Sequence, residues 1–387
     1  RQEVAEGRRA RADCRLLDAA GGRFRRALYA GDRGHYPWGM PHALILRAPG
    51  TNCDQEMVRA FQMAGATTDL VHVDRVIASP ERLEDAHLLG FPGGFSYGDD
   101  LASGRLFALK LRERLWPALR AAVERGVLVI GACNGFQVLV QAGLLPGPAS
   151  AGEEWPEHPP AQVTALTFNA GGRFMDRWVG VAPVDESVCV WTRGLIEQFG
   201  GADGSAADVM MLPIAHGEGR FVAKSAAVLE RLQRQGQVAL RYRENVNGSE
   251  DAIAGICDPS GRVLGLMPHP ERYLDWTRHP YWTRLAPGAA RGDTPGLAMF
   301  RNAVRAAALT TSVRGRGAGR RGPGAGVRAR HERAGWWRTS GRARGVATTC
   351  RGCRRPGTAR SAGVRSGSRA RARAETNWRR STTRRRG

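Results

Sequence analysis

One stretch of the chain, VLVIGACNGFQVLVQAG (127–143), restricts the possible fold more than any other. An apolar run leads into the turn GACNG (131–135), and an amphipathic helical pattern follows. A G-x-nucleophile-x-G turn of this kind joins a strand to a helix and lifts one side chain above a sheet. Its glycines are needed because the sharp turn leaves no room for side chains. The start of a helix favours a thiolate, so Cys133 is a candidate nucleophile; the alternative is a buried, inert cysteine.

The residues before this stretch alternate between short apolar segments and helical patterns. Strands are expected at 43–46, 67–73 and 86–91, and helices at 54–64 and 104–125. This alternation predicts an α/β fold with a mostly parallel sheet covered by helices on both faces. In such sheets, sites form at the carboxyl ends of the strands. We therefore expect three strand-end turns to converge on one edge: PGTN (49–52), PGG (92–94) and the elbow at Cys133.

The pattern changes after the elbow helix. Residues 147–160 form a Pro/Gly/Glu-rich insertion, expected at the surface, where a shorter connection would be normal. The following segments predict a β-rich portion, and a closing helix is expected at about 296–309. Because the insertion lies downstream of the elbow helix, we expect it to affect partner docking more than chemistry.

Charge divides the chain into three parts. The net charge is +22, but residues 312–387 hold 23 arginines and two acidic residues, which leaves +1 for residues 1–311. We expect a domain at 42–310, a disordered or spurious extension at 1–41 and a disordered Arg/Gly-rich tail at 311–387. The tail has three interpretations: an RNA-binding segment, a solvated tail without function, or sequence read in a wrong frame. We favour the last two, so a nucleic-acid partner is not expected.

The number of cysteines and the hydropathy of the chain indicate the cellular compartment in which the protein is expected. Seven cysteines at irregular spacing suit a reducing cytoplasm better than a disulfide framework. Cys350 and Cys353 resemble half of a zinc site, but no second pair follows them, so no metal site is expected. The chain has no apolar run near the ~20 residues of a membrane span, so no membrane association is expected.

A cysteine nucleophile needs a base, and the base needs a group that orients it. In MPHPER (267–272), prolines flank His269 and hold the segment extended. Residues two apart then point the same way, so Glu271 can bind one ring nitrogen while the other faces Cys133. A histidine in a surface turn is the alternative. His216, followed by Glu218, is the competing base; we interpret it as substrate-contacting or structural, because the glycines around it predict a less rigid loop.

An acyl-transfer reaction also needs donors for an oxyanion. Gly93 and Gly94 can present a backbone N–H at close approach, and the N–H of Asn134 follows the nucleophile directly. An ordinary tight turn is the alternative for the two glycines.

Seven ordered motifs over about residues 42–309 resemble one family, the class I (triad) glutamine amidotransferases. Within it, they are most similar to the glutaminase subunits of phosphoribosylformylglycinamidine synthase. The motifs are PGTNCD (49–54), FPGGFSYGDDL (91–101), GACNGFQ (131–137), GGRFMDRWV (171–179), PIAHGEGRF (213–221), NGS (247–249) and MPHPER (267–272).

The resemblance implies a flavodoxin-like fold and a glutaminase reaction. It implies that Cys133, His269 and Glu271 are the catalytic triad, that Gly94 and Asn134 bind the oxyanion, and that Gln137 lies near glutamine. It also implies that ammonia passes to a synthetase subunit, with a small accessory subunit in the complex. That synthetase uses ATP and Mg²⁺ to make formylglycinamidine ribonucleotide in purine synthesis, and no cofactor is expected on this chain.

Two other functions remain open at this point. A cysteine hydrolase or peptidase-like protein of the same fold would also use an elbow cysteine. A binding module would depend on the basic tail, and removal of 312–387 would then abolish function. We expect truncation after Thr311 to leave glutamine hydrolysis intact.

Overall fold

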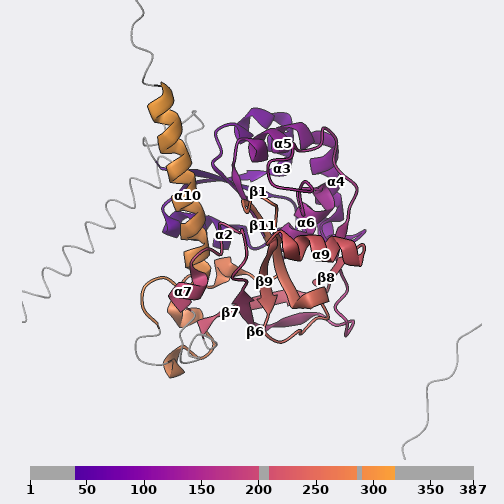
Figure 1. Ribbon diagram of the computed structural model, residues 1–387, viewed down its shortest axis with the longest axis vertical. Helices are drawn as coiled ribbons and strands as arrows, with labels where there is room; N and C mark the ends of the chain where they lie inside the picture. The colour runs from indigo at the N-terminus through magenta and orange to yellow at the C-terminus, as the bar shows by residue number, and fades with distance from the viewer. Residues whose placement is uncertain (1–39, 200–208, 286–289, 319–387) are drawn as a thin grey trace, which may run out of the picture. The chain divides into compact units, whose positions relative to one another are not determined.

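The computed structural model describes residues 40–199, 209–285 and 290–318 (Figure 1). The expectations for the extension before residue 40 and for the tail beyond 318, including Cys350 and Cys353, lie outside these residues. Within the described part of the chain, no helix is long and apolar enough to cross a membrane.

A nine-stranded sheet forms the centre of the domain, in the order β2-β1-β3-β4-β11-β10-β9-β6-β7. The first five strands in this order are parallel, and the other four are added antiparallel. The strands are β1 (His42–Arg47), β2 (Thr67–His72), β3 (Leu88–Phe91), β4 (Leu128–Ala132), β6 (Met175–Pro183), β7 (Met211–His216), β9 (Val238–Tyr242), β10 (Ile253–Cys257) and β11 (Val263–Leu266). Two further strands, β5 (Thr164–Thr167) and β8 (Arg220–Ala223), form a separate antiparallel pair. The expected α/β class, with a mostly parallel central sheet and a β-rich later portion, is confirmed.

Helices cover both faces of this sheet. They are α2 (Asp54–Ala64), α3 (Val73–Ala78), α4 (Arg105–Arg114), α5 (Trp116–Glu124), α6 (Asn134–Ala142), α7 (Leu195–Phe199), α9 (Ala226–Arg234) and α10 (Pro295–Ala318). One apolar core lies under α2, α7 and α10, and a second lies under α3 to α6 and α9 (Figure 1). Strands β3, β4 and β11 are buried on both faces, which explains why they read as uninterrupted apolar runs.

The single helix expected at 104–125 is wrong, because the chain breaks at Leu115 into α4 and α5. Pro117 lies in the first turn of α5, where its missing N–H costs nothing, whereas inside a continuous helix it would remove a hydrogen bond. The closing helix also differs, since α10 runs on to Ala318 rather than ending near residue 309.

The insertion at 147–160 is attached to the domain. Trp155 is buried and packs edge-on against Trp116 of α5, whose Nε1 donates to the carbonyl of Pro156 at 3.2 Å. Arg112 of α4 donates to the carbonyls of Pro159 and Pro160. The segment is therefore fixed on α4 and α5 by a buried indole and by backbone carbonyls.

Candidate active site

Cys133 is the turning point between β4 and α6. Its backbone has φ 51° and ψ −109°, a conformation that costs a non-glycine residue energy and is held only by its surroundings. One such restraint is visible: the Cys133 N–H donates to the carbonyl of Leu266, at the end of the neighbouring strand β11, at 2.8 Å. The thiol is almost buried and lies 3.5 Å from the carbonyl of Ala215, at the end of β7.

The two glycines of the elbow have no space for a side chain. A Cβ on Gly131 would lie 2.6 Å from the carbonyl oxygen of Gly135, and one on Gly135 would lie 1.8 Å from that of Phe91. Both neighbours are backbone atoms of packed elements and cannot move independently. The G-x-C-x-G spacing is therefore a packing requirement of the elbow.

Gly135→Ala should destabilise the domain strongly, because the new methyl group would overlap the Phe91 carbonyl of β3. We expect a loss of at least about 3 kcal/mol in the free energy of unfolding, measured by urea denaturation. Gly171→Ala is the matched control, since nothing lies within 4 Å of its added Cβ, and its change should stay within about 0.5 kcal/mol. Similar stability of the two variants would contradict this account of the elbow.

His269 and Glu271 follow β11 and form a buried pair. The Nδ1 of His269 lies 2.6 Å from the Oε1 of Glu271, and both side chains are almost completely enclosed. The backbone N–H of His269 donates to the carbonyl of Pro213 in β7, which fixes the start of the segment. Glu271 lies in the 3-10 turn Pro270–Arg272, so the expectation of an extended segment is wrong after His269. The turn, rather than the alternation of an extended chain, brings the Glu271 carboxylate back to the ring. The carboxylate therefore orients the ring with Nδ1–H toward it and leaves Nε2 free for the site.

Cys133 and His269 border the same backbone position, Gly93. A Cβ added there would lie 2.5 Å from the Cε1 of His269 and 3.4 Å from the Cβ of Cys133. Burial alone would lower the pKa of His269, but the Glu271 carboxylate and the adjacent thiols of Cys133 and Cys53 hold that pKa well above its usual value. The pair Glu271–His269 thus stabilises a positive charge beside the Cys133 sulfur.

The PGG turn after β3 packs against the PGTN turn after β1. The carbonyl of Gly93 accepts from the N–H groups of Asn52 and Cys53, each at 3.2 Å. Gly94 has φ 140°, and a Cβ there would lie 2.6 Å from the carbonyl oxygen of Gly50. The two turns therefore approach each other next to Cys133, as the convergence of strand ends requires.

Asn134 is the first residue of α6, so its N–H has no acceptor within the helix. Its side chain is buried, accepts from the Ser96 N–H at 3.3 Å and donates to Asp99 and Gln137. Gln137 in turn donates to the carbonyl of Glu218 at 2.5 Å. The elbow helix is thus connected to the loop after β3 and to the loop after β7.

Asp99 belongs to the motif FPGGFSYGDDL (91–101), but the sequence does not indicate its role. Its carboxylate accepts from the Ser103 hydroxyl at 2.9 Å and from Asn134, and burial raises its pKa above the ordinary value. Asp99 has φ 53°, so this loop is strained as well as hydrogen-bonded. Its contact with Asn134 is the feature that relates it to the site.

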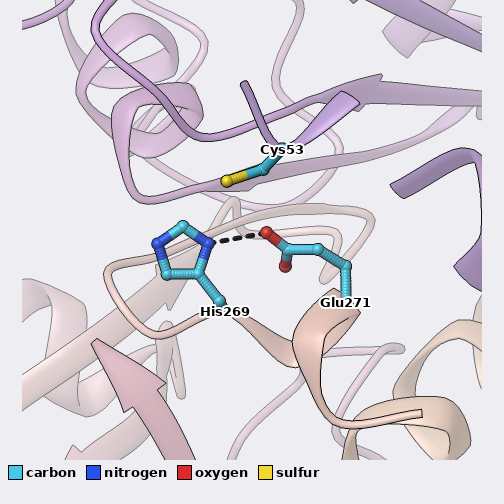
Figure 2. A group of neighbouring side chains, drawn as sticks. All are labelled: Cys53, His269 and Glu271. Atoms are coloured by element: carbon cyan, nitrogen blue, oxygen red, sulfur yellow. Dashed lines mark hydrogen bonds and ion pairs between the residues drawn. The ribbon is translucent and has the colours of Figure 1, made fainter. Parts of the chain in front are cut away.

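Cys53 is a second thiol at the site that sequence reasoning missed. Figure 2 shows it directed at the His269–Glu271 pair, and atoms of the three residues lie within 4.8 Å of one another. Arg272 donates from a guanidinium nitrogen to the Cys53 sulfur at 3.1 Å. This fixed cation disfavours a metal ion between the three side chains, although a cysteine, a histidine and a carboxylate could otherwise ligate one.

His216 does not belong to a loose loop, so the expectation of lower rigidity there is wrong. It is the last residue of β7, is 3 % exposed, and its Nδ1 lies 3.0 Å from the Oδ1 of Asn169. Gly219 packs on the ring so closely that a Cβ would lie 2.2 Å from it. Burial, with the nearby His269 charge, lowers the pKa of His216 to about 4, so its ring is neutral at physiological pH.

Comparison with known proteins identifies the family. A model of the CobB/CobQ-like glutamine amidotransferase domain matches residues 40–305. The PurQ subunit of phosphoribosylformylglycinamidine synthase from Dehalococcoides mccartyi is 41% identical over 268 residues, which cover 68% of this chain and 96% of that protein. The PurQ subunit of Methanococcus maripaludis is 39% identical, with coverages of 68% and 97%.

A solved structure agrees with these sequence relatives. The structure of PurLQS from Thermotoga maritima contains a chain that is 32% identical, with a TM-score of 0.50, covering 69% of this chain and 99% of that one. The chain therefore belongs to the PurQ family, the glutamine amidotransferase subunits of phosphoribosylformylglycinamidine synthase.

Proposed function

We propose that this chain hydrolyses glutamine to glutamate and ammonia through Cys133, His269 and Glu271. The observation that carries the proposal is the meeting of a strained elbow cysteine and a Glu271-bound histidine at Gly93. Cys133 attacks the side-chain amide carbon, and His269 moves the thiol proton to the leaving nitrogen. Ammonia departs, a glutamyl thioester remains, and water activated by His269 releases glutamate.

The surrounding backbone supplies the remaining functions in this proposal. The N–H groups of Gly94 and Asn134 stabilise the oxyanion, while Gly93 allows the close approach of His269 and Cys133. Gln137 and His216 contact glutamine in this proposal. Gln137 donates to the carbonyl of Glu218 in the loop after β7, and His216 is the last residue of that strand.

The ammonia passes to a synthetase subunit, which uses ATP and Mg²⁺ to convert formylglycinamide ribonucleotide to the amidine. The relative from Thermotoga maritima was solved as PurLQS, a name that supports a complex with a synthetase and a small accessory subunit. In this proposal the chain itself carries no cofactor. Free cysteines at positions 53, 133, 189 and 257 support a reducing cytoplasmic setting.

The experiment is a glutaminase assay with and without the synthetase and accessory subunits. We expect glutamate release in the presence of the partners, coupled to amidine formation when ATP is supplied. Absence of glutamine turnover under both conditions would contradict the proposal, and turnover of peptides in place of glutamine would favour the cysteine hydrolase of the same fold.

A further inference from the structure

The side chain of Arg272 makes an unexpected contact beside the His269–Glu271 pair. Arg272 directly follows Glu271, whose Oε2 has no hydrogen-bond partner among the described residues, and a buried carboxylate next to an arginine would ordinarily pair with it. The guanidinium instead donates to the sulfur of Cys53 at 3.1 Å, across 219 residues of sequence. Cys53 is 1 % exposed, so the contact lies inside the domain. The proposed mechanism gives neither residue a role.

The thiol of Cys53 is hydrogen-bonded as both a donor and an acceptor. Its S–H donates to the Oδ1 of Asn52 at 3.2 Å, which leaves the sulfur lone pairs to accept from Arg272. The backbone N–H groups of Asn52 and Cys53 both donate to the carbonyl of Gly93, each at 3.2 Å. Cys53 therefore joins the guanidinium of Arg272 to the PGG turn (92–94).

At its other end, the contact is anchored in the turn that carries Glu271. The backbone N–H of Arg272 donates to the carbonyl of His269 at 3.2 Å and closes this turn. The His269 ring borders Gly93 so closely that a Cβ there would lie 2.5 Å from its Cε1. The base and the PGG turn thus come from distant segments, and the Arg272–Cys53 hydrogen bond joins these segments beside the ring.

We infer that Arg272 and Cys53 are positioning residues, whose hydrogen bond holds the turn carrying Glu271 at a fixed distance from the PGG turn, so that His269 meets the Cys133 sulfur. The inference rests on the proposed function. Neither residue forms a bond or transfers a proton in the reaction. Because a displacement of about 1 Å at a reacting group can lower a rate by on the order of 10²-fold, loss of this contact should appear in kcat rather than in KM.

Three substitutions test the contact in the assembled complex. Cys53→Ala removes the acceptor, Arg272→Met removes the donors and keeps an apolar stem, and Cys53→Ser keeps a smaller acceptor. For each variant, amidine formation is measured with glutamine and with ammonium salts as the nitrogen source. Arg120→Met is the matched control, because the Arg120 side chain pairs with Glu124 within α5, on the surface.

We expect Cys53→Ala and Arg272→Met each to lower kcat on glutamine about tenfold, with KM and the ammonia-dependent rate within about twofold of the wild type. The double variant should also lose about tenfold, and not a hundredfold, because both substitutions remove the same hydrogen bond. Cys53→Ser should stay within about threefold of the wild type, and Arg120→Met within about twofold.

Unchanged kcat in both single variants, multiplied losses in the double variant, or equal losses with glutamine and with ammonium salts would overturn the inference. A loss in Arg272→Met without a loss in Cys53→Ala would also overturn it, because Arg272 would then act through its charge rather than through the sulfur. Cys53→Val, which roughly keeps the side-chain volume, replaces Cys53→Ala if that variant does not fold. A wild-type complex that releases no glutamate would refute the proposed function, and the inference with it.

Discussion

Cys133→Ala is expected to lower glutamine-dependent amidine formation by at least about 10³-fold, because it removes the sulfur that forms the thioester in the proposed mechanism. Synthesis from added ammonium salts should continue at the wild-type rate, since the partner's reaction needs only the nitrogen. Both activities are measured in the same assembled complex by following amidine formation. The contrast between the two nitrogen sources is what distinguishes a nucleophile from a structural cysteine.

Two other buried cysteines serve as comparisons for this experiment. Cys189→Ala removes a thiol of the apolar core and should leave kcat on glutamine within about twofold. Cys53→Ala tests the other thiol beside His269. If Cys53→Ala abolished glutamine use and Cys133→Ala did not, the nucleophile would be wrongly assigned; loss of the ammonia-dependent reaction in Cys133→Ala would mean that the residue supports assembly.

Glu271→Gln is the second change with a large expected effect, a fall of about 10² to 10⁴-fold in kcat on glutamine. The carboxylate accepts from Nδ1 of His269, whereas an amide can donate to that nitrogen and select the wrong tautomer. Removal of the negative charge should also lower the pKa of His269, because Glu271 is the main group that raises it against burial. The ring would then lose its proton at a lower pH than in the wild type.

The pKa change is measured by following the His269 ring protons in NMR titrations of both proteins. Glu197→Gln, an exposed substitution on α7, is the matched control and should alter neither kcat nor the titration. A Glu271→Gln variant with wild-type kcat and an unshifted His269 titration would show that the 2.6 Å contact does not orient the base.

The sequence predicts those parts of the site that backbone sterics dictate. Only glycine fits two residues either side of Cys133, and Pro270 begins the 3-10 turn that brings Glu271 back to the ring. The alternation of apolar segments and helices likewise predicts the parallel part of the sheet. In each case the signal lies within a few residues of the feature that it predicts.

The other features of the site depend on contacts between segments that are distant in the sequence. The sulfur of Cys53 accepts a hydrogen bond from Arg272, 219 residues later, and Asn169 lies within hydrogen-bond distance of the ring of His216, 47 residues away. Neither the hydrophobic periodicity of the sequence nor the spacing of its motifs indicates such pairs. The sequence does contain a signal for the break at Leu115, because Pro117 follows it closely. The apolar spacing of the surrounding residues nevertheless predicts one continuous helix.

The pairing of β11 with β4 has a consequence for synthesis of the chain. Leu266 lies in register with Ala132, and its carbonyl receives the N–H of Cys133, so the last strand of the sheet completes a site begun 133 residues earlier. In a chain that is still being translated, the Cys133 sulfur has no base, and the edge of β4 that later pairs with β11 is unpaired. In the proposed mechanism, a chain can therefore hydrolyse glutamine only after His269 and Glu271 have been translated and β11 has paired with β4.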